Sequence, residues 1–495
     1  MLLYSLGGIL LGLAWIYPGS LASAALGAVA AFLLIYATKK KRSYFASWAF
    51  GLLSHGIAFY WLFGTIKNFG GYNWGVSSLF FALFIATQSL IFPLFTFLYS
   101  RINFGLQKRI GISATLAWLL TSFLFVRIFP WDFSHTMSAV RHLTQIADIA
   151  GDTLITALVI FCAESLSIYL IDTKQRKLLL FPIILLLATI TYSTLQINYY
   201  GDSKNFLSQI KTTMIQGDVS IQKKGNMQFL GTNLKTYWEA SKAAINTENP
   251  ELVIWPESVI TQEINVTAQN LEETGYLPDF TPVNFLTGAL SFDSRSNVKK
   301  IHNSAFGINT KGQIFTPYHK QILMPFGEYI PFSNLYPKVK ELAPFIPDFT
   351  AGEKVEVFPF NKNLKVAPLI CYEDLLPSIS QTASQLGATL LVNLTNDAWF
   401  GRSVASRQHN LIASFRAIEN RRFLLRSTNS GLTSIVDPTG KTTAELPIFT
   451  TASLSKTIGL LNQQSIFSKF STNRIWWLFY AYAIICLLYN LRKRS

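Results

Sequence analysis

Residues 365–374 read KVAPLICYED, and this is the strongest fold signal in the middle of the chain. The apolar run before the cysteine is typical of a buried strand. Pro377 then begins a helical pattern, so Cys371 is expected at an elbow between a strand and a helix. Because backbone amides at such an elbow favour a thiolate, Cys371 is a candidate nucleophile. A cysteine that only fills the core is the alternative.

The same alternation of strand-like and helical patterns extends over residues 201–473. Strands are expected at 212–215, 252–255, 283–290, 365–370, 389–394 and 432–436, and helices at 233–245, 378–386 and 405–422. Turn sequences at 309–312 and 437–440 indicate hairpins. We interpret residues 201–473 as one large α/β domain.

Eight apolar stretches flank this domain. They cover residues 2–17, 20–38, 45–64, 75–100, 110–129, 153–172, 178–195 and 475–491. Each is close to the roughly 20 residues that a helix needs to cross a bilayer. The first stretch has no positive segment before it and runs into the second, so we expect no signal cleavage. The predicted domains are a seven-helix membrane domain (1–200), the α/β domain (201–473), and an eighth helix with a basic tail (474–495).

The basic surplus lies in the apolar flanks. The chain has 42 Lys+Arg and 27 Asp+Glu, a net charge of +15, but residues 201–473 are nearly neutral. A nucleic-acid binder would cluster its basic residues on the polar domain, so that class is excluded. Thirteen basic residues fall in alternate loops: Lys39, Lys40, Lys41, Arg42, Arg101, Lys108, Arg109, Lys174, Arg176, Lys177, Arg492, Lys493 and Arg494. The positive-inside rule then places both termini in the cytoplasm and the α/β domain outside.

Three cysteines are too few for a disulfide framework in an oxidising compartment. Cys162 and Cys486 lie in expected spans, where we interpret them as small buried hydrophobes. The six histidines show no metal-ligand spacing, so neither a metal nor another cofactor is expected.

Two further segments end a strand-like run at a reactive side chain. Residues 252–258 read LVIWPES and present Glu257 after a proline, where an apolar environment would make it a general base. Residues 317–332 read PYHKQILMPFGEYIPF and contain Lys320, a candidate partner for an oxyanion, with Glu328 beside it. Alone, Glu257 and Lys320 are each better interpreted as solvated surface loop residues. The apolar content of the second segment indicates a surface that meets lipid or an acyl chain.

Together, Glu257 after Trp-Pro, Lys320 before Pro-Phe-Gly-Glu and Cys371 before Tyr-Glu resemble the Glu-Lys-Cys triad of the nitrilase (carbon–nitrogen hydrolase) superfamily. Residues 393–401 (NLTNDAWFG), 408–409 (QH) and 426–431 (RSTNSG), with the eight apolar stretches, resemble the apolipoprotein N-acyltransferase family in particular. The resemblance covers nearly the whole chain. It implies a polytopic α-helical membrane domain joined to an extracytoplasmic α-β-β-α sandwich.

The resemblance also implies a two-step acyl transfer. Cys371 would take a fatty acyl group from a membrane phospholipid as a thioester, with Glu257 as base and Lys320 facing the oxyanion. The α-amino group of a diacylglyceryl-cysteine on an apolipoprotein would then accept it. Glu328, Tyr372 and Glu373 are supporting candidates. The implied setting is the bacterial inner membrane, with the catalytic domain of a monomer in the periplasm.

The sequence departs from that family at residues 218–226, which read DVSIQKKGN. The family usually has an Asn after Gln-Gly and then a Lys-Trp pair that shapes the substrate site. The tryptophan is missing near Gly225. The triad chemistry is untouched, but the way in which the lipoprotein is held is expected to differ.

Two other functions stay open on the sequence alone. A membrane-tethered nitrilase or amidase would use the same triad on a small substrate, although one helix would suffice to tether it. A transporter with an outside binding domain is the second alternative. Transporters tend to carry charge pairs within the membrane, whereas Glu164, in the sixth expected span, has no evident basic partner in the sequence. We expect Glu164 to have a packing role.

Overall fold

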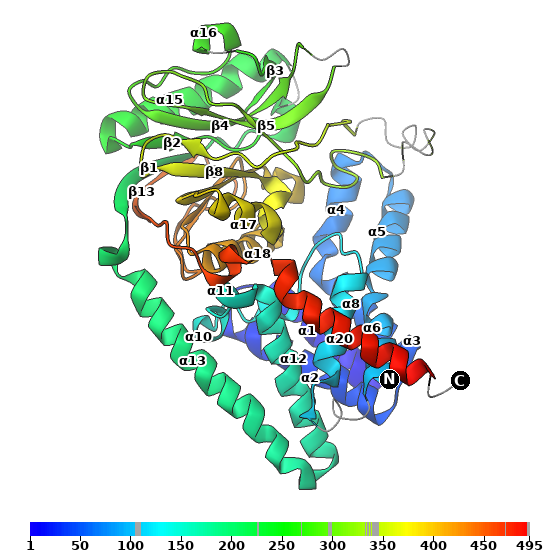
Figure 1. The fold of residues 1–495 in the computed structure, drawn as a ribbon. Helices are drawn as coiled ribbons and strands as arrows, with labels where there is room; N and C mark the ends of the chain where they lie inside the picture. The colour runs from blue at the N-terminus through cyan, green and yellow to red at the C-terminus, as the bar shows by residue number, and fades with distance from the viewer. Residues whose placement is uncertain are drawn as a thin grey trace. The chain divides into compact units, whose positions relative to one another are not determined.

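The chain divides into two compact parts in the computed structural model (Figure 1). The helical unit comprises Met1–Tyr199 and Ser465–Ser495, and the α/β unit comprises Tyr200–Gln464. The structure describes residues 1–103, 110–224, 227–268, 270–295, 299–331, 333, 336, 338, 346–470 and 472–492. Lys108, Arg109, Gly225, Asn226, Phe332, Lys493 and Arg494, on which some of the expectations fall, lie outside the described residues.

The helical unit is built from apolar helices joined by short connections. Its longer helices are α1 (Leu2–Ile16), α2 (Leu21–Lys40), α3 (Tyr44–Ala58), α4 (Tyr60–Phe69), α5 (Trp74–Gln88), α6 (Ile91–Ile102), α8 (Ser113–Leu124), α12 (Asp152–Ile171), α13 (Leu180–Gly201) and α20 (Thr472–Arg492). Single turns α9 (Phe133–Thr136), α10 (Arg141–Thr144), α11 (Ala147–Ala150) and α19 (Ile466–Lys469) connect some of them. Every apolar stretch expected to span a membrane therefore contains helix.

Four helical segments of the described chain are long and apolar enough to cross a bilayer. They are Leu21–Lys40, Trp74–Ile102, Asp152–Ile171 and Thr173–Gly201. Helices α3 and α4 pass the same test only as a pair bent by 59°. The apolar helices Leu2–Ile16, Ser113–Leu124 and Trp476–Asn490 are shorter. The structure thus supports a helical membrane domain, while the number of eight crossings stays a prediction.

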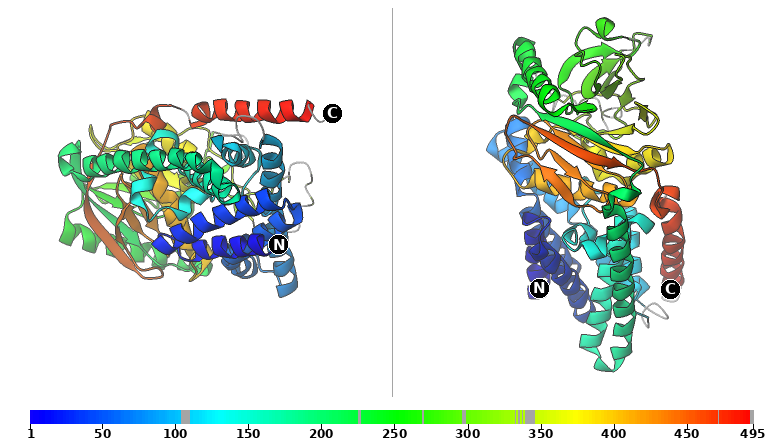
Figure 2. Two further views of the ribbon diagram at one scale, coloured as in Figure 1. Left: turned by 90° about the horizontal axis from the view of Figure 1, so that it is seen from below. Right: turned by 90° about the vertical axis from the view of Figure 1, so that its left-hand side faces the viewer.

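The two ends of the chain meet in the helical unit. Helix α20 lies along α6 and α8, although it follows the α/β unit in sequence. The Trp476 indole donates a hydrogen bond to the carbonyl of Ala150 (3.0 Å). The start of α1 and the end of α20 lie toward the same end of this unit (Figures 1 and 2). That arrangement requires an even number of crossings if both ends of the unit face water.

Glu164 corrects one expectation from the sequence. Its buried carboxylate lies 3.6 Å from the ammonium of Lys39 at the end of α2. It also accepts hydrogen bonds from the Tyr99 hydroxyl (2.9 Å) and the Ala114 amide (2.7 Å). This pair could not be predicted from the sequence, because the packing of α2 against α12 brings the partners together. The pair ties helices to one another, which is a packing role, and its presence removes one argument against a transporter.

The α/β unit contains two sheets and flanking helices. Its strands are β1 (Ser208–Gln216), β2 (Leu252–Ile254), β3 (Ile260–Asn265), β4 (Asn284–Phe292), β5 (Ile301–Ile308), β6 (Tyr318–His319), β7 (Phe358–Pro359), β8 (Lys365–Ile370), β9 (Leu390–Thr395), β10 (Leu424–Thr428), β11 (Ser434–Val436), β12 (Thr442–Glu445) and β13 (Ala452–Leu460). The longer helices are α15 (Leu230–Glu248), α17 (Pro377–Gln385) and α18 (Ala405–Asn420), with shorter α14 (Ile221–Lys224) and α16 (Leu271–Thr274). The expected strands and helices are all present, and the two expected hairpin turns follow β5 and join β11 to β12.

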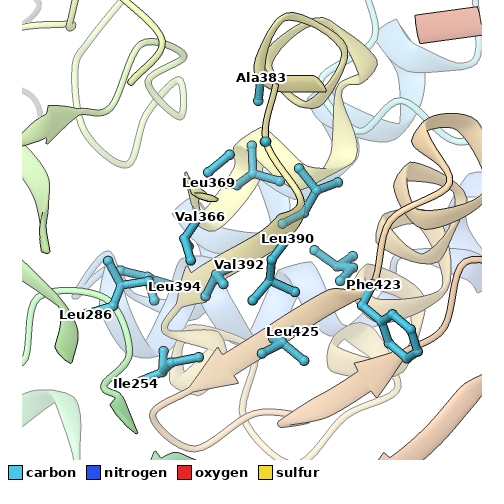
Figure 3. Packing of buried hydrophobic residues seen from close by; sticks show 14 of the residues in the cluster. Ile254, Leu286, Val366, Leu369, Ala383, Leu390, Val392, Leu394, Phe423 and Leu425 are labelled. Carbon is cyan, nitrogen blue, oxygen red and sulfur yellow. The ribbon is translucent and has the colours of Figure 1, made fainter. Parts of the chain in front are cut away.

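One sheet has the order β13-β1-β2-β4-β5-β6, with β3 beside β4, and the other has the order β12-β11-β10-β9-β8-β7. The alternation along β2 shows how they stack. Leu252 and Ile254 join the core between the sheets, whereas Val253 points to the opposite face, which α15 covers. Leu390, Val392 and Leu425 fill the same core from the second sheet (Figure 3). With α17 and α18 on its far side, the unit is an α-β-β-α sandwich (Figure 1).

Parallel pairing positions the site. Strands β8, β9 and β10 are neighbours and run parallel, so their carboxyl ends meet at one edge of the second sheet. Cys371 follows β8, Asp397 follows β9 and Asn429 follows β10. In the first sheet, β2 is parallel to β1 and β4 and leads to Glu257. Open α/β sheets bind ligands beyond the carboxyl ends of their strands.

Candidate active site

Glu257 lies in a tight turn directly after β2. The turn passes so close to β4 that a Cβ on Gly288 would lie 2.6 Å from the Ser258 amide and 2.7 Å from the Glu257 Cα. Ser258 itself has a φ of 47°, in the left-handed region. Glycine at position 288 therefore lets the turn press against the sheet and buries the Glu257 side chain.

Lys320 and Glu328 form a buried ion pair beside Glu257. The Lys320 Nζ lies 2.7 Å from Glu328 Oε2 and 3.8 Å from Glu257 Oε1. The Asn303 amide bridges the two carboxylates, since its Nδ2 donates to Glu257 Oε1 (2.8 Å) and to Glu328 Oε1 (3.1 Å). The Met324 amide also donates to Glu328 (2.8 Å). One cation and two anions are thus fixed by side chains that are themselves buried.

Cys371 is the first residue of a 3-10 turn, Cys371–Leu375, that follows β8. Its φ of 51° is unusual for a residue other than glycine and marks a strained elbow. Two residues of the neighbouring strand β9 hold it: the Asn393 Nδ2 donates to the Cys371 carbonyl (3.0 Å), and the Thr395 hydroxyl hydrogen-bonds the sulfur. The structure therefore places the expected strand-to-helix elbow at Cys371.

Burial changes the protonation of the three groups. Burial raises the pKa of Glu257, although the Lys320 ammonium opposes it. Burial acts against the ammonium of Lys320, but the Glu328, Cys371 and Glu257 charges outweigh it and raise its pKa. Burial and then the Glu257 charge raise the pKa of the Cys371 thiol. The expectation that helix amides favour a thiolate is wrong for the resting site, because desolvation and the Glu257 charge outweigh the Lys320 ammonium and the Thr395 hydroxyl. Cys371 thus needs a base, and Glu257 is nearby.

Glu373 and Tyr372 follow the cysteine. One Glu373 oxygen accepts hydrogen bonds from the Tyr318 hydroxyl (2.8 Å) and the amides of Gln321 (2.7 Å) and Ile322 (3.2 Å). The other accepts from the Ile370 amide (2.8 Å). Glu373 therefore joins the elbow to the segment on either side of Lys320. Tyr372 is buried in the same turn.

Sequence reasoning missed two residues of this site. Asn303 comes from the middle of β5, with no strand end or turn to draw attention to it. Lys224 lies on α14, and its Nζ donates to the Glu257 carbonyl (2.6 Å). Burial lowers the pKa of Lys224 to about 8, and the Glu257 and Cys371 charges only partly offset this. The signal in the sequence that could have pointed to Lys224 is its position in residues 218–226, where the sequence departs from the family it resembles.

The loop after Lys320 carries exposed apolar surface within the α/β unit. Phe326 is 61% exposed, whereas Ile330 is buried. Trp399, in the segment after β9, is 42% exposed. The contact with lipid or an acyl chain that the sequence predicts for the loop after Lys320 stays a prediction.

Comparison with known proteins gives the family. A family model described as carbon-nitrogen hydrolase matches residues 213–460, half of the chain and nearly all of the α/β unit. The chain belongs to the carbon–nitrogen hydrolase family. A second model, the apolipoprotein N-acyltransferase N-terminal domain, matches residues 7–164 of this carbon–nitrogen hydrolase family member.

Curated relatives of this family member cover both units. The apolipoprotein N-acyltransferase of Geobacter metallireducens is 28% identical over 99% of this chain and 95% of its own length. That of Shewanella oneidensis is 28% identical over 87% of this chain and 84% of its own. The similarity therefore extends through the helical unit.

Among solved structures, Nit3 of Saccharomyces cerevisiae, of the nitrilase superfamily, is similar to the α/β part of this carbon–nitrogen hydrolase family member. The two are 18% identical with a TM-score of 0.41, over 51% of this chain and 91% of Nit3. A Nesterenkonia amidase of the same superfamily is 15% identical with a TM-score of 0.37, over 54% of this chain and 97% of its own.

Proposed function

We propose that this protein is an apolipoprotein N-acyltransferase, which moves a fatty acyl group from a membrane phospholipid to the α-amino group of an N-terminal diacylglyceryl-cysteine. One observation carries the proposal. A carbon–nitrogen hydrolase domain with a buried Glu and Lys beside a partly buried Cys is joined to a helical unit that matches the N-terminal domain of apolipoprotein N-acyltransferases. A lipid-anchored donor and acceptor require such a membrane part.

In the first half-reaction, Glu257 takes the proton of the Cys371 thiol as the sulfur attacks the ester carbonyl of the phospholipid. The carbonyl oxygen becomes an oxyanion, which the Lys320 ammonium stabilises. The tetrahedral intermediate collapses and the carbon–oxygen ester bond breaks. Glu257 returns its proton to the leaving oxygen, so lysophospholipid departs and an acyl thioester stays on Cys371.

In the second half-reaction, the α-amino group of the apolipoprotein attacks the thioester carbonyl. Glu257 removes a proton from that nitrogen, and Lys320 again faces the oxyanion. The carbon–sulfur bond breaks, and the Cys371 sulfur recovers the proton from Glu257. The products are an N-acylated lipoprotein and the starting enzyme, which is a ping-pong scheme.

The supporting residues set the geometry of these steps. Glu328 holds the Lys320 ammonium at 2.7 Å, which fixes its position beside Glu257. Glu373 holds the elbow to the Lys320 segment through three hydrogen bonds, and a fourth, from the Ile370 amide, lies within the elbow. Tyr372 lines the site next to the thiol. The Asn303 amide donates to both the Glu257 and the Glu328 carboxylates. It therefore orients Glu257 and lies between the two carboxylates.

We further propose that the α/β unit works as a monomer on the periplasmic side of a bacterial inner membrane. The alternate placement of basic residues between apolar stretches supports this orientation. The common end reached by α1 and α20 supports an even number of crossings with both termini in the cytoplasm.

The test supplies purified protein with phospholipid alone. A thioester on Cys371, detected by mass spectrometry, is the expected result. The tethered amidase alternative predicts an unmodified Cys371 and release of ammonia from an amide or nitrile. Complementation of a bacterium depleted of its own apolipoprotein N-acyltransferase tests the whole reaction, and Cys371→Ala is expected to abolish it. A transporter would keep its function in that variant.

A further inference from the structure

Four buried charges form a closed ring behind the cysteine elbow. The His409 Nε2 lies 2.7 Å from Asp374 Oδ1, and its Nδ1 lies 2.9 Å from Asp397 Oδ1. The Arg426 Nε donates to Asp374 Oδ2 (2.9 Å), and its Nη2 lies 3.9 Å from Asp397 Oδ2. Each residue is at most 7% exposed. Two anions and two cations thus alternate around a neutral ring, named here the charge ring.

The geometry of the charge ring sets the protonation of His409. Both ring nitrogens face carboxylate oxygens, and only an imidazolium can donate from both nitrogens. A neutral imidazole would turn a lone pair toward one of the two carboxylates. The charged or titratable groups that face His409 are Asp374 on the 3-10 turn, Asp397 after β9 and Arg426 on β10, and the Phe400 ring is the nearest aromatic group.

The charge ring is attached to Cys371 along two routes. Asp374 belongs to the same 3-10 turn, three residues after Cys371. Asp397 follows Thr395, whose hydroxyl contacts the Cys371 sulfur, and Arg426 pairs in register with Asn393, which holds the Cys371 carbonyl. The segment that contains Gly431 also packs closely against Asp397. A Cβ on Gly431 would lie only 2.4 Å from the Asp397 Cβ.

These contacts account for three sequence segments that the acyl-transfer steps leave without a role. Asp397 belongs to 393–401, His409 to 408–409, and Arg426 and Gly431 to 426–431. All three segments meet at the charge ring. We propose that Asp374, Asp397, His409 and Arg426 are positioning residues that hold the Cys371 elbow, and that His409 must be an imidazolium for the thiol to sit in its reactive position.

The proposal predicts a pH limit. The carboxylates raise the pKa of His409 from 6.5 to about 9, against the effect of burial. A raised folded-state pKa means that the stabilisation by the charge ring is present in full below the ordinary value of 6.5. It is lost as pH rises through about 9. The reactivity of Cys371 should decline over the same range.

The experiment uses the full-length protein in detergent and compares a variant on β10 with one just before that strand. Arg426→Lys disrupts the charge ring. Arg422→Lys is the matched control, because Arg422 is equally buried but donates to backbone carbonyls, such as that of Ala388, at the opposite end of the strands. His409→Gln removes the imidazolium. Two rates are measured: alkylation of Cys371 by iodoacetamide, and thioester formation from vesicles of phosphatidylethanolamine and phosphatidylglycerol.

Arg426→Lys and His409→Gln are expected to slow both rates by about 100-fold, the effect of a small displacement of a reacting group. Arg422→Lys should react like the wild type. The wild-type rate of thioester formation should fall as pH rises through about 9, and the residual rate of His409→Gln should show no such fall. Lys224 also titrates on the alkaline side, but its effect is common to both proteins, so the fall assigned to His409 is the part that the wild type shows and His409→Gln does not.

The inference is wrong if the charge-ring variants are alkylated at the wild-type rate, or if His409→Gln keeps the alkaline fall. Should His409→Gln fail to fold because one carboxylate charge is left unbalanced, the double variant His409→Gln with Asp397→Asn restores neutrality. It should fold and still react slowly, and a wild-type rate would overturn the proposal. The inference rests on the proposed function only for the thioester arm. Absence of thioester in the wild type, with alkylation still dependent on the charge ring, would reject the function alone.

Discussion

Two buried charge clusters lie on either side of the Cys371 elbow, and they differ in balance. The charge ring is neutral, and each of its ionised groups faces two opposite charges. At the active site, the carboxylates of Glu257 and Glu328 face the Lys320 ammonium, from which Glu257 is the more distant at 3.8 Å, and the second ammonium, Lys224, donates to the backbone carbonyl of Glu257. In a cluster whose charges balance, the side chains keep their protonation states and their positions. An unbalanced one leaves a carboxylate that can take a proton, as a general base must.

The largest effect is expected when the Cys371 thiol, which lies between the two clusters, is removed. Cys371→Ala is expected to lower the rate of N-acylation by at least about 10⁴-fold, because no thioester can form. The measurement is acyl transfer to a diacylglyceryl peptide in proteoliposomes. Cys162→Ala, in the helical unit, is the matched control and should keep its activity, and a residual rate in Cys371→Ala near that of the control would contradict the assignment.

Removing the charge of Glu257 or of Lys320 tests the first half-reaction, the formation of the thioester. Glu257→Gln and Lys320→Ala should each slow thioester formation by about 10²- to 10⁴-fold, since both groups act in the first half-reaction. Single-turnover mass spectrometry of Cys371 measures this. Glu263 on β3, a partly exposed carboxylate that pairs with Lys299, offers a control, Glu263→Gln, that should form the thioester normally. Normal accumulation in either active-site variant would show that its role lies elsewhere.

Removing a positive charge outside the Glu257, Lys320 and Cys371 triad tests whether Glu257 is the general base. Glu257 must be ionised to accept a proton, so the rate should fall as pH drops through its raised pKa. The positive charge of Lys224 holds that pKa down, so Lys224→Met should move the acid limb to higher pH by about one unit. Lys223→Met, which removes an exposed neighbouring charge, should leave the pH profile of thioester formation unchanged. An unmoved acid limb in Lys224→Met would argue against Glu257 as the base.

The smallest expected effect lies outside both clusters. Phe326→Ser removes an exposed ring from the loop after Lys320 and should raise the KM for phospholipid by about threefold to tenfold, with kcat little changed. Phe326→Leu keeps an apolar side chain and should lie near the wild type. A fall in kcat with unchanged KM would mean that the loop affects the chemistry rather than lipid contact.

The sequence predicted the local pieces of this molecule well. Strands such as Lys365–Ile370 and the elbow at Cys371 could be read from apolar runs that stop at turn residues, because burial and turn formation are local properties. Strands β5, β10 and β13 were missed, since polar residues such as Asn303 and Arg426 interrupt their apolar patterns.

Features that depend on tertiary packing could not be predicted from the sequence. The Lys39–Glu164 pair and the charge ring each join segments far apart in the chain. The direction of the Cys371 pKa was predicted wrongly, because desolvation and the neighbouring Glu257 charge depend on which segments pack around the thiol. The roles of Glu257, Lys320 and Cys371 stay predictions for the variants above to test.

The most direct test of the account isolates the acyl-enzyme. Wild-type protein is loaded with phospholipid, freed of lipid, and mixed with a diacylglyceryl-cysteine peptide. The ping-pong account predicts that Cys371 loses its acyl group as the peptide gains it on its α-amino group, in equal amounts and with no added phospholipid. A thioester that stays on Cys371, or a peptide acylated only when phospholipid is present, would contradict transfer through Cys371.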